Sequence, residues 1–203
     1  LNMTFNTNKT VCMIFNPVNR SSWVASKFPP FVLGGCLLKF VDNFKYLGHI
    51  ITNSFSDDSD INREIRLLFT RTNILLRRFK RCSRPVKIKL FRSYCICFYG
   101  TALWQYFSAG AIHKFGSCYN RCLKLFFNFA KYSSVTAMLL ELGLPSFNTL
   151  QHNYNVFFKS SLAGCINMIV KLTFWHSIRW LMFASLSAFY FHFSSCILIF
   201  LSV

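Results

Sequence analysis

Acidic residues are scarce in this chain of 203 residues, which has 6 Asp and Glu against 23 Lys and Arg. Five of the six carboxylates fall between Asp42 and Glu64, and Glu141 is the sixth. Few acids are therefore left for acid–base catalysis. The formal net charge of +17 instead attracts polyanions, such as a phosphate backbone or anionic lipid head groups.

The sequence also lacks the short motifs of several enzyme classes. It has no glycine-rich phosphate loop, no Gly-x-Ser-x-Gly segment and no His-Glu-x-x-His segment. Independent enzymatic activity is therefore not expected, and neither is a cofactor bound by this chain. Residues 1–10 are polar and contain no apolar h-region, so they do not predict a secretory signal.

The nine cysteines predict no disulfide framework, because their number is odd and their spacing is irregular. A reduced intracellular compartment, nucleus or cytoplasm, fits this pattern. Two close pairs are candidates for zinc ligands: Cys95 with Cys97, and Cys118 with Cys122. A closed zinc site needs four converging ligands, and neither pair has the usual spacing to a second pair. We expect these cysteines to lie in a helical core instead.

Short apolar runs predict a small strand-rich unit at the start of the chain. Residues 9–16 form one β-prone run, and residues 31–33 form a second that stops at Gly34-Gly35. Residues 37–40 follow the glycine pair at once, which predicts a hairpin. The segment 44–51 closes this unit.

From Ile61 the apolar period changes from two to about 3.6 residues, which predicts an amphipathic helix. Its apolar face comprises Ile61, Ile65, Leu68, Thr72, Leu75 and Phe79. The opposite face carries Arg63, Arg66, Thr70, Arg77 and Arg81, within roughly 60° of one another at about 100° per residue. One side is expected to pack, and the other is expected to form a cationic ridge.

Further amphipathic patterns predict helices at about residues 86–107 and 112–129, which suggests a bundle. A fourth helix is expected to begin at a Ser134 cap and to stop at Gly143. Residues 149–170 form a weaker helical stretch.

The end of the chain has a different composition, because residues 181–203 contain no Lys, Arg, Asp or Glu. A helix of this length can span a hydrocarbon core. Lys171 and Arg179 would place the preceding side in the cytoplasm. A transmembrane helix is one interpretation, and a non-native tail from an altered reading frame is the other.

The segment Phe5-Asn6-Thr7-Asn8-Lys9-Thr10 resembles motif D of the reverse transcriptases of non-LTR (LINE-type) retrotransposons, in which Asn-x-x-Lys-Thr precedes a palm strand. Asn6, Lys9 and Thr10 match that pattern. The resemblance implies an auxiliary role for Lys9 near the incoming triphosphate. Without the catalytic aspartates, we expect Lys9 to be a solvated turn residue.

Further along, residues 44–48 resemble the Phe-x-Tyr-Leu-Gly hairpin of the same family, which is motif E or the primer grip. The implied primer-grip residues are Phe44, Lys45, Tyr46, Leu47 and Gly48. Residues 56–65, followed by the arginine-striped helix, resemble the start of the family's thumb. The order and spacing of the motifs agree over about residues 1–165.

The resemblance implies a C-terminal fragment of an RNA-directed DNA polymerase, which contacts the RNA–DNA template-primer duplex. The implied phosphate-binding residues are Arg63, Arg66, Arg77 and Arg81. In the family, Mg²⁺ is held by aspartates of motifs A and C, upstream of where this sequence begins, and no Tyr-x-Asp-Asp segment occurs here. We expect binding without polymerisation by this chain alone. The alternative is a small basic protein anchored in a membrane by residues 181–203.

The expected fold class is α+β, with a partial palm hairpin unit, a helical thumb and post-thumb bundle, and a hydrophobic C-terminal helix. The expected domains are a partial palm over 1–55, thumb helices over 56–132, a post-thumb segment over 133–170 and a hydrophobic tail over 171–203.

Three aspartates precede or begin the striped helix: Asp57, Asp58 and Asp60. Such a cluster can suggest a metal site. Acidic residues at this position also stabilise the positive end of a helix and cap its free amides. We expect the capping role.

Overall fold

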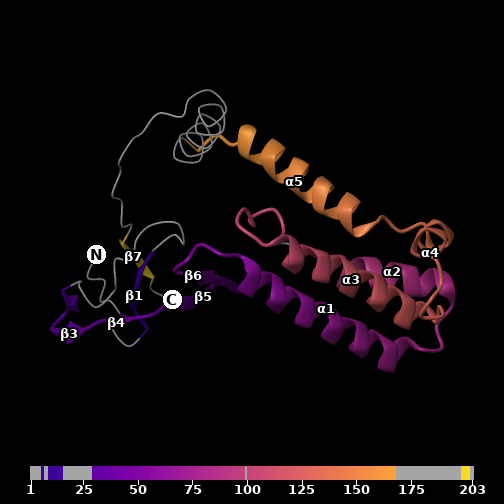
Figure 1. The fold of residues 1–203 in the computed structure, drawn as a ribbon, viewed down its shortest axis with the longest axis horizontal. Coiled ribbons are helices and arrows are strands. Elements are labelled where there is room, and N and C mark those ends of the chain that lie inside the picture. Colours follow the sequence, from indigo (N-terminus) through magenta and orange to yellow (C-terminus); the bar gives the residue numbers. More distant parts are fainter. Residues whose placement is uncertain (1–5, 7–8, 16–28, 99, 168–197, 202–203) are drawn as a thin grey trace. The chain divides into compact units, whose positions relative to one another are not determined.

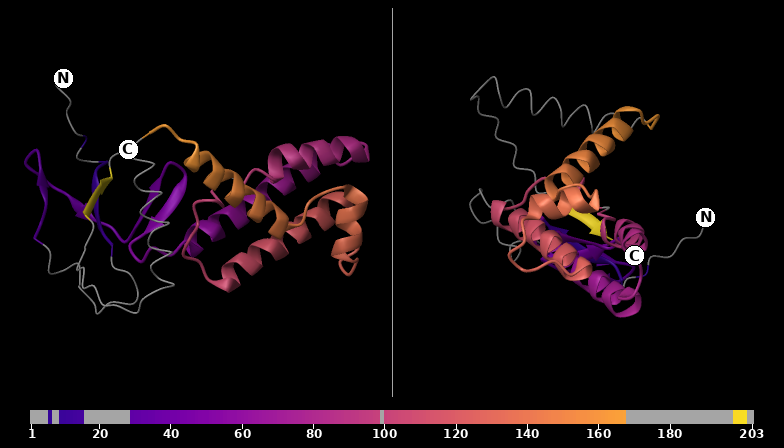
Figure 2. Two further views of the ribbon diagram at one scale, coloured as in Figure 1. Left: turned by 90° about the horizontal axis from the view of Figure 1, so that it is seen from above. Right: turned by 90° about the vertical axis from the view of Figure 1, so that its right-hand side faces the viewer.

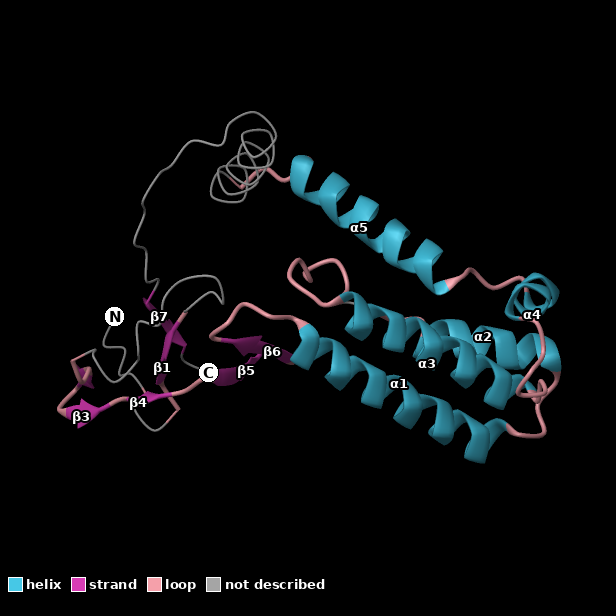
Figure 3. Ribbon diagram, in the orientation of Figure 1, coloured by secondary structure: helices cyan, strands magenta, loops and turns pink. Residues whose placement is uncertain are grey.

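The computed structural model describes residues 6, 9–15, 29–98, 100–167 and 198–201. This part of the chain is a mixture of helices and short strands (Figures 1 and 3), as the sequence predicted at that level. It divides into two compact units. The first contains the described residues of 1–97, 104–128 and 195–203, and the second contains those of 98–103 and 129–194.

The strands are β1 (Val11–Ile14), β2 (Val32–Leu33), β3 (Cys36–Leu37), β4 (Lys39–Phe40), β5 (Asn43–Tyr46), β6 (His49–Thr52) and β7 (Leu198–Leu201). The helices are α1 (Asp58–Phe79), α2 (Arg84–Cys95), α3 (Ala109–Phe127), α4 (Val135–Leu142) and α5 (Phe147–Ala163). All strands and α1 to α3 belong to the first unit, and α4 and α5 belong to the second.

Strand β1 is the middle strand of a three-stranded sheet. It pairs in parallel with β4, where Val11 lies opposite Lys39, and antiparallel with β7, where Val11 lies opposite Leu201. The residues of β1 are apolar, and Cys12, Met13 and Ile14 are buried, as expected for a strand with neighbours on both sides. The Phe15 ring, directly after β1, stacks on Phe55 with ring centroids 4.6 Å apart.

Two antiparallel hairpins form where the sequence predicted tight turns. The first joins β2 to β3 through Gly34 and Gly35, whose φ angles are 58° and 78°. These positive angles are accessible to glycine at little cost. The second hairpin, β5 with β6, leads directly into α1 (Figure 2).

Helix α1 confirms the predicted apolar period. Ile61, Leu68, Thr72 and Leu75 are buried, and Thr72 donates its hydroxyl hydrogen to the Leu68 carbonyl at 2.8 Å. The buried side of α1 packs along α3 (Figure 1). Helix α3 contributes the large buried side chains Phe115, Tyr119 and Phe126. A packed helical core therefore supports the opposite, exposed side of α1.

Phe91 of α2 is at the centre of the aromatic core between α2 and α3. It is fully buried, and its ring centroid lies 6.2 Å from Tyr119, 5.9 Å from Phe126 and 6.0 Å from Phe127. Aromatic groups at these separations attract one another in addition to burying apolar area. This packing fixes α2 on α3.

The predicted helix over residues 86–107 is wrong in its second half, because α2 ends at Cys95. Residues 105 to 108 instead form a loop whose backbone amides are bound by side chains of Asp57 and Asp58. These acceptors satisfy amides that would otherwise require helical partners. The predicted helix over 112–129 forms as α3, which ends at Phe127 because Asn128 adopts a left-handed φ of 60°.

The second unit confirms the fourth predicted helix. The Ser134 Oγ accepts a hydrogen bond from the Ala137 amide at 3.4 Å, and Gly143 ends α4 with a φ of 60°. Helix α5 ends at Ala163, short of the predicted residue 170. Phe98 packs edge-to-face on Phe147, with ring centroids 6.2 Å apart.

The predicted hydrophobic C-terminal helix falls largely on residues 168–197, which lie outside the described residues. Leu198–Leu201 are not helical, because they pair with β1 as strand β7. Among the helices of the described residues, none combines the length and hydropathy needed to cross a membrane.

Candidate nucleic-acid interface

The predicted primer-grip residues form one hairpin, with Phe44 opposite Ile51 and Tyr46 opposite His49. Leu47 and Gly48 occupy a two-residue turn, with φ angles of 46° and 89°. Positive φ at both central positions is typical of a type I′ turn, which matches the twist of the flanking strands. Gly48 therefore has the permissive role that the sequence predicted.

The turn exposes an apolar side chain to solvent. Leu47 is 83% exposed, whereas Phe44 is half-buried and can brace the hairpin. Tyr46 and Lys45 are exposed. Leucine disfavours a positive φ, and residues held in such conformations concentrate at ligand-binding positions. The tip of this hairpin is thus a candidate contact surface.

Asp60 joins this hairpin to the first turns of α1. Its Oδ1 accepts hydrogen bonds from the Ile50 amide at 2.9 Å and from Arg63 Nε at 2.6 Å. Its Oδ2 accepts from Trp104 Nε1 at 2.9 Å and lies 3.1 Å from His49 Nδ1. A carboxylate can only accept, so Nδ1 of His49 carries the proton in this pair.

Asp60 remains ionised despite being only 2% exposed. Burial by itself raises the pKa of this carboxyl, but the hydrogen bonds from Arg63, Ile50, Trp104 and His49 outweigh burial and lower the pKa to about 2. The negative charge is therefore retained in the interior, where it holds three segments of the chain together.

The side-chain capping of α1 that the sequence predicted for all three aspartates is wrong, although Asp58 and Asp60 do lie in its first turn. Asp57 makes no side-chain cap of α1, and its Oδ2 instead accepts from the amides of Gln105 and Tyr106, both at 2.8 Å. Asp58 Oδ1 accepts from the Ser108 amide at 2.8 Å. Burial raises the pKa of Asp57, against these amide bonds, and the charges of Asp60 and Asp58 raise it further.

These aspartates do not fit the paired Mg²⁺ of a polymerase. Their oxygens already accept hydrogen bonds from backbone amides, an indole and a guanidinium. Among the described residues, no group of three or more His, Cys, Asp or Glu side chains is arranged to hold a metal ion. The arrangement binds protein segments to one another.

The four predicted phosphate-binding arginines occupy different environments. Arg66 and Arg77 are exposed on α1, and Arg81 is exposed in the turn beyond its end. We call Arg66, Arg77 and Arg81 the cationic face. Arg63 is not part of this free surface, because it is 17% exposed and pairs with Asp60 and Glu64.

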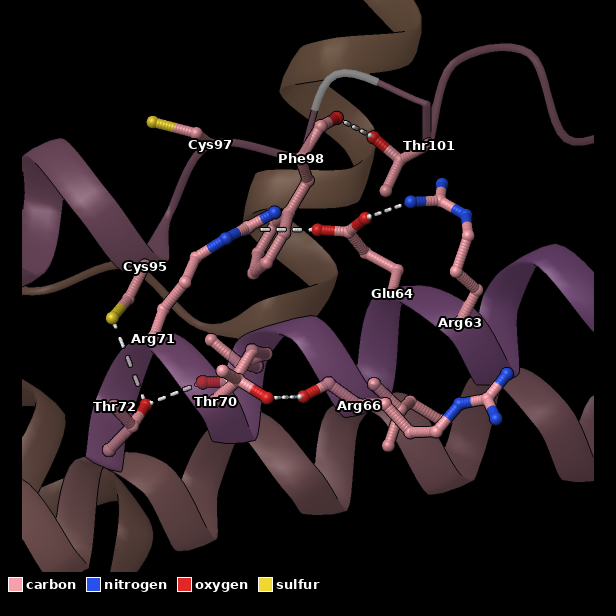
Figure 4. A network of polar contacts seen from close by, with 12 residues as sticks. Arg63, Glu64, Arg66, Thr70, Arg71, Thr72, Cys95, Cys97, Phe98 and Thr101 are labelled. Atoms are coloured by element: carbon pink, nitrogen blue, oxygen red, sulfur yellow. Dashed lines mark hydrogen bonds and ion pairs between the residues drawn. The ribbon is translucent and has the colours of Figure 1, made fainter. Parts of the chain in front are cut away.

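Figure 4 shows why Arg63 and Arg66 differ. The Glu64 carboxylate lies between Arg63 Nη1, at 3.3 Å, and Arg71 Nη1, at 3.0 Å. The Arg71 contact is an ion pair without hydrogen-bond alignment. Arg66 extends away from this cluster, so its charge faces solvent (Figure 4).

The charges of α1 are separated along its length. Asp58 and Asp60 lie in its first turn, and Arg77 and Arg78 lie in its last turn. Both arrangements stabilise the helix through its dipole. They also leave the C-terminal half of α1 cationic, as a surface that contacts phosphates requires.

Three residues of the segment that resembles motif D are described, Asn6, Lys9 and Thr10, and they lie directly before β1. The Asn6 carbonyl accepts hydrogen bonds from the amides of Lys9 and Thr10, both at 3.1 Å, and from the Thr10 hydroxyl at 2.8 Å. Thr10 is buried and Lys9 is exposed. Lys9 thus has the solvated turn position that we expected.

Three of the four cysteines considered as zinc ligands are core residues, as predicted. Cys95, Cys118 and Cys122 are buried between α1, α2 and α3, and Cys95 Sγ lies 3.7 Å from Thr72 Oγ1. Burial raises the pKa of the Cys95 thiol to about 12. Cys97 differs, because it lies beyond the end of α2, half-exposed, and donates to the Ser93 carbonyl at 2.8 Å.

The sequence did not predict that Asp60, with a hydrogen bond from Trp104, connects the β5–β6 hairpin to α1. The available signal was helical spacing: Glu64 precedes buried Leu68 by four residues, and Asp60 precedes Glu64 by four. This spacing puts both acids at the edge of the buried face. No local signal identifies Trp104, which lies 44 residues from its acceptor.

Comparisons with known proteins gave no match among family models, curated proteins or solved structures.

Proposed function

We propose that this chain is the hairpin and thumb part of a non-LTR retrotransposon reverse transcriptase, and that it binds the RNA–DNA template-primer duplex. The observation that carries the proposal is the β5–β6 hairpin joined to α1, at the residues that resemble the primer grip and the start of the thumb. Its exposed tip and the cationic face of α1 belong to the same compact unit.

The proposed role is binding without chemistry by this chain alone. The sequence contains no Tyr-x-Asp-Asp segment, and its own aspartates are engaged in hydrogen bonds within the protein. Contacts from arginine to phosphate orient a duplex without reading its sequence. We therefore expect affinity that depends strongly on salt and weakly on base sequence.

The test is binding of the full chain to a short RNA–DNA hybrid, followed by fluorescence anisotropy across about 50 to 200 mM salt. One variant carries Arg66→Gln, Arg77→Gln and Arg81→Gln. Arg63 is kept, because its replacement would also disturb Asp60. Loss of three phosphate contacts should reduce the slope of log K against log salt by about 2 to 3.

The matched control carries Lys39→Gln, Lys114→Gln and Lys159→Gln, three exposed cations outside the proposed interface. Both variants lower the formal net charge from +17 to +14. A specific interface predicts a clearly larger loss for the arginine variant. Equal losses would show that net charge alone attracts the hybrid, and would refute the proposed interface.

A further inference from the structure

We propose that Asp60 is the positioning residue of this interface. It holds the β5–β6 hairpin in a fixed orientation on α1, so that the hairpin tip and the cationic face engage one duplex together. This inference rests on the proposed function. Asp60 itself is buried, so its effect on binding passes through the hairpin.

The hairpin depends on α1 for its orientation. It is a two-stranded sheet of its own, separate from the β4-β1-β7 sheet. An isolated two-stranded hairpin is at best marginally stable in water. Among the described residues, both polar contacts that tie the β6 side of the turn to α1, from Ile50 and from His49, end on Asp60.

The geometry of Asp60 requires a carboxylate. Each of its oxygens receives two donors, since Oδ1 meets Ile50 N and Arg63 Nε while Oδ2 meets Trp104 Nε1 and His49 Nδ1. An asparagine offers one accepting oxygen and one NH₂ donor. In either orientation of the amide, its NH₂ would face at least one group that can only donate, which is Trp104 Nε1 in one orientation and Ile50 N with Arg63 Nε in the other. Asp60→Asn should therefore release the hairpin.

Glu64 provides the matched control. It is a second buried carboxylate on the same helix, but its partners are Arg63 and Arg71 rather than hairpin residues. Glu64→Gln therefore removes an internal charge from α1 without removing a contact to β5 or β6. A general loss of stability in α1 affects both variants, whereas release of the hairpin affects only Asp60→Asn.

The first measurement is hydrogen exchange of the full chain, read by mass spectrometry. Asp60→Asn should increase exchange across residues 43–52 about tenfold or more, and leave α3 near the wild-type rate. Glu64→Gln should leave residues 43–52 unchanged. Unchanged exchange of the hairpin in Asp60→Asn, or an equal increase in α3, would overturn the inference. If Asp60→Asn does not fold, His49→Phe is measured instead, because it removes one of the two hairpin contacts to Asp60 and should also increase exchange across residues 43–52, and unchanged exchange there would overturn the inference.

The second measurement is a double-mutant cycle on hybrid binding. In the wild type, Lys45→Gln at the hairpin and Arg77→Gln on α1 should each weaken binding about two- to fivefold. In the Asp60→Asn background, Lys45→Gln should have no further effect, whereas Arg77→Gln should keep its effect. An undiminished effect of Lys45→Gln would refute the positioning role.

The two measurements separate the two proposals. If neither Lys45→Gln nor Arg77→Gln changes binding of the wild-type chain, the proposed function fails. Hydrogen exchange then still decides whether Asp60 positions the hairpin, because it requires no ligand.

Discussion

Replacement of Asp60 by Asn should lower the free energy of unfolding by an amount that depends on pH. The hydrogen bonds to Asp60 lower its pKa from the ordinary 3.8 to about 2. At about 1.36 kcal/mol for each pH unit, this difference corresponds to about 2 kcal/mol of stability that only the charged form contributes. The NH₂ of the asparagine also faces at least one donor, so the total loss at neutral pH should be about 2 to 4 kcal/mol.

The direction of the pH dependence follows from the lowered pKa. A carboxyl whose pKa is lowered by folding contributes its full stabilisation above the pKa of the unfolded chain, near 4, and loses it as pH falls towards about 2. Asp60→Asn has no such titration. The difference in stability between wild type and variant should therefore shrink by about 2 kcal/mol between pH 6 and pH 2.

Urea denaturation followed by circular dichroism, at a series of pH values, measures this difference. Asp57→Asn is the control, because burial raises the pKa of Asp57 and its charged form is correspondingly unfavourable. The difference in stability between wild type and Asp57→Asn should not shrink as pH falls. A constant difference between wild type and Asp60→Asn from pH 6 to pH 2 would refute the assignment of a stabilising internal charge.

Three further experiments test local features of the structure. Gly48→Ala should destabilise the protein by about 1 kcal/mol, because the φ of 89° is strained for alanine. Leu47→Asn should stabilise the same turn, because asparagine tolerates the positive φ at position 47 better than leucine does. Thermal melts compare the two variants. Asn128→Gly should stabilise the end of α3 by up to about 1 kcal/mol, since glycine adopts its φ of 60° more readily, and an unchanged or lower melting temperature would contradict this. Iodoacetamide at pH 8 should label exposed Cys36 in the native protein and label Cys95 only after denaturation, because Cys95 is fully buried and its pKa is about 12. Peptide mass spectrometry gives the order of labelling, and early labelling of Cys95 would contradict this prediction.

Local patterns in the sequence predicted the elements whose cause is local. The spacing of the apolar residues in α1 is sufficient to predict a helix there. Gly34-Gly35 and Gly48 mark turns that need positive φ. Ser134 and Gly143 likewise fix the two ends of α4 through contacts within a few residues. These features need no knowledge of the rest of the fold.

Two of the predictions that were wrong concern contacts between distant residues. Acidic residues favour the N-termini of helices, which led us to predict side-chain caps for α1. Asp57 and Asp58 instead accept hydrogen bonds from backbone amides 48 to 50 residues away in the sequence. The same contacts hold residues 105 to 108 in a loop, although the sequence predicted a helix up to residue 107. The prediction for Arg63 was wrong for a local reason: the helical wheel placed Arg63 on the exposed face, but ion pairs with Asp60, three residues earlier, and with adjacent Glu64 draw its side chain inward.

The placement of the carboxylates has a consequence for handling the protein. All six lie in the described part of the chain, and only Asp42 and Glu141 among them are exposed. The outer surface therefore has almost no anions that could repel a competing polyanion. Host RNA should accompany the chain through purification at low salt, with an absorbance ratio at 260 to 280 nm that falls only after a high-salt wash.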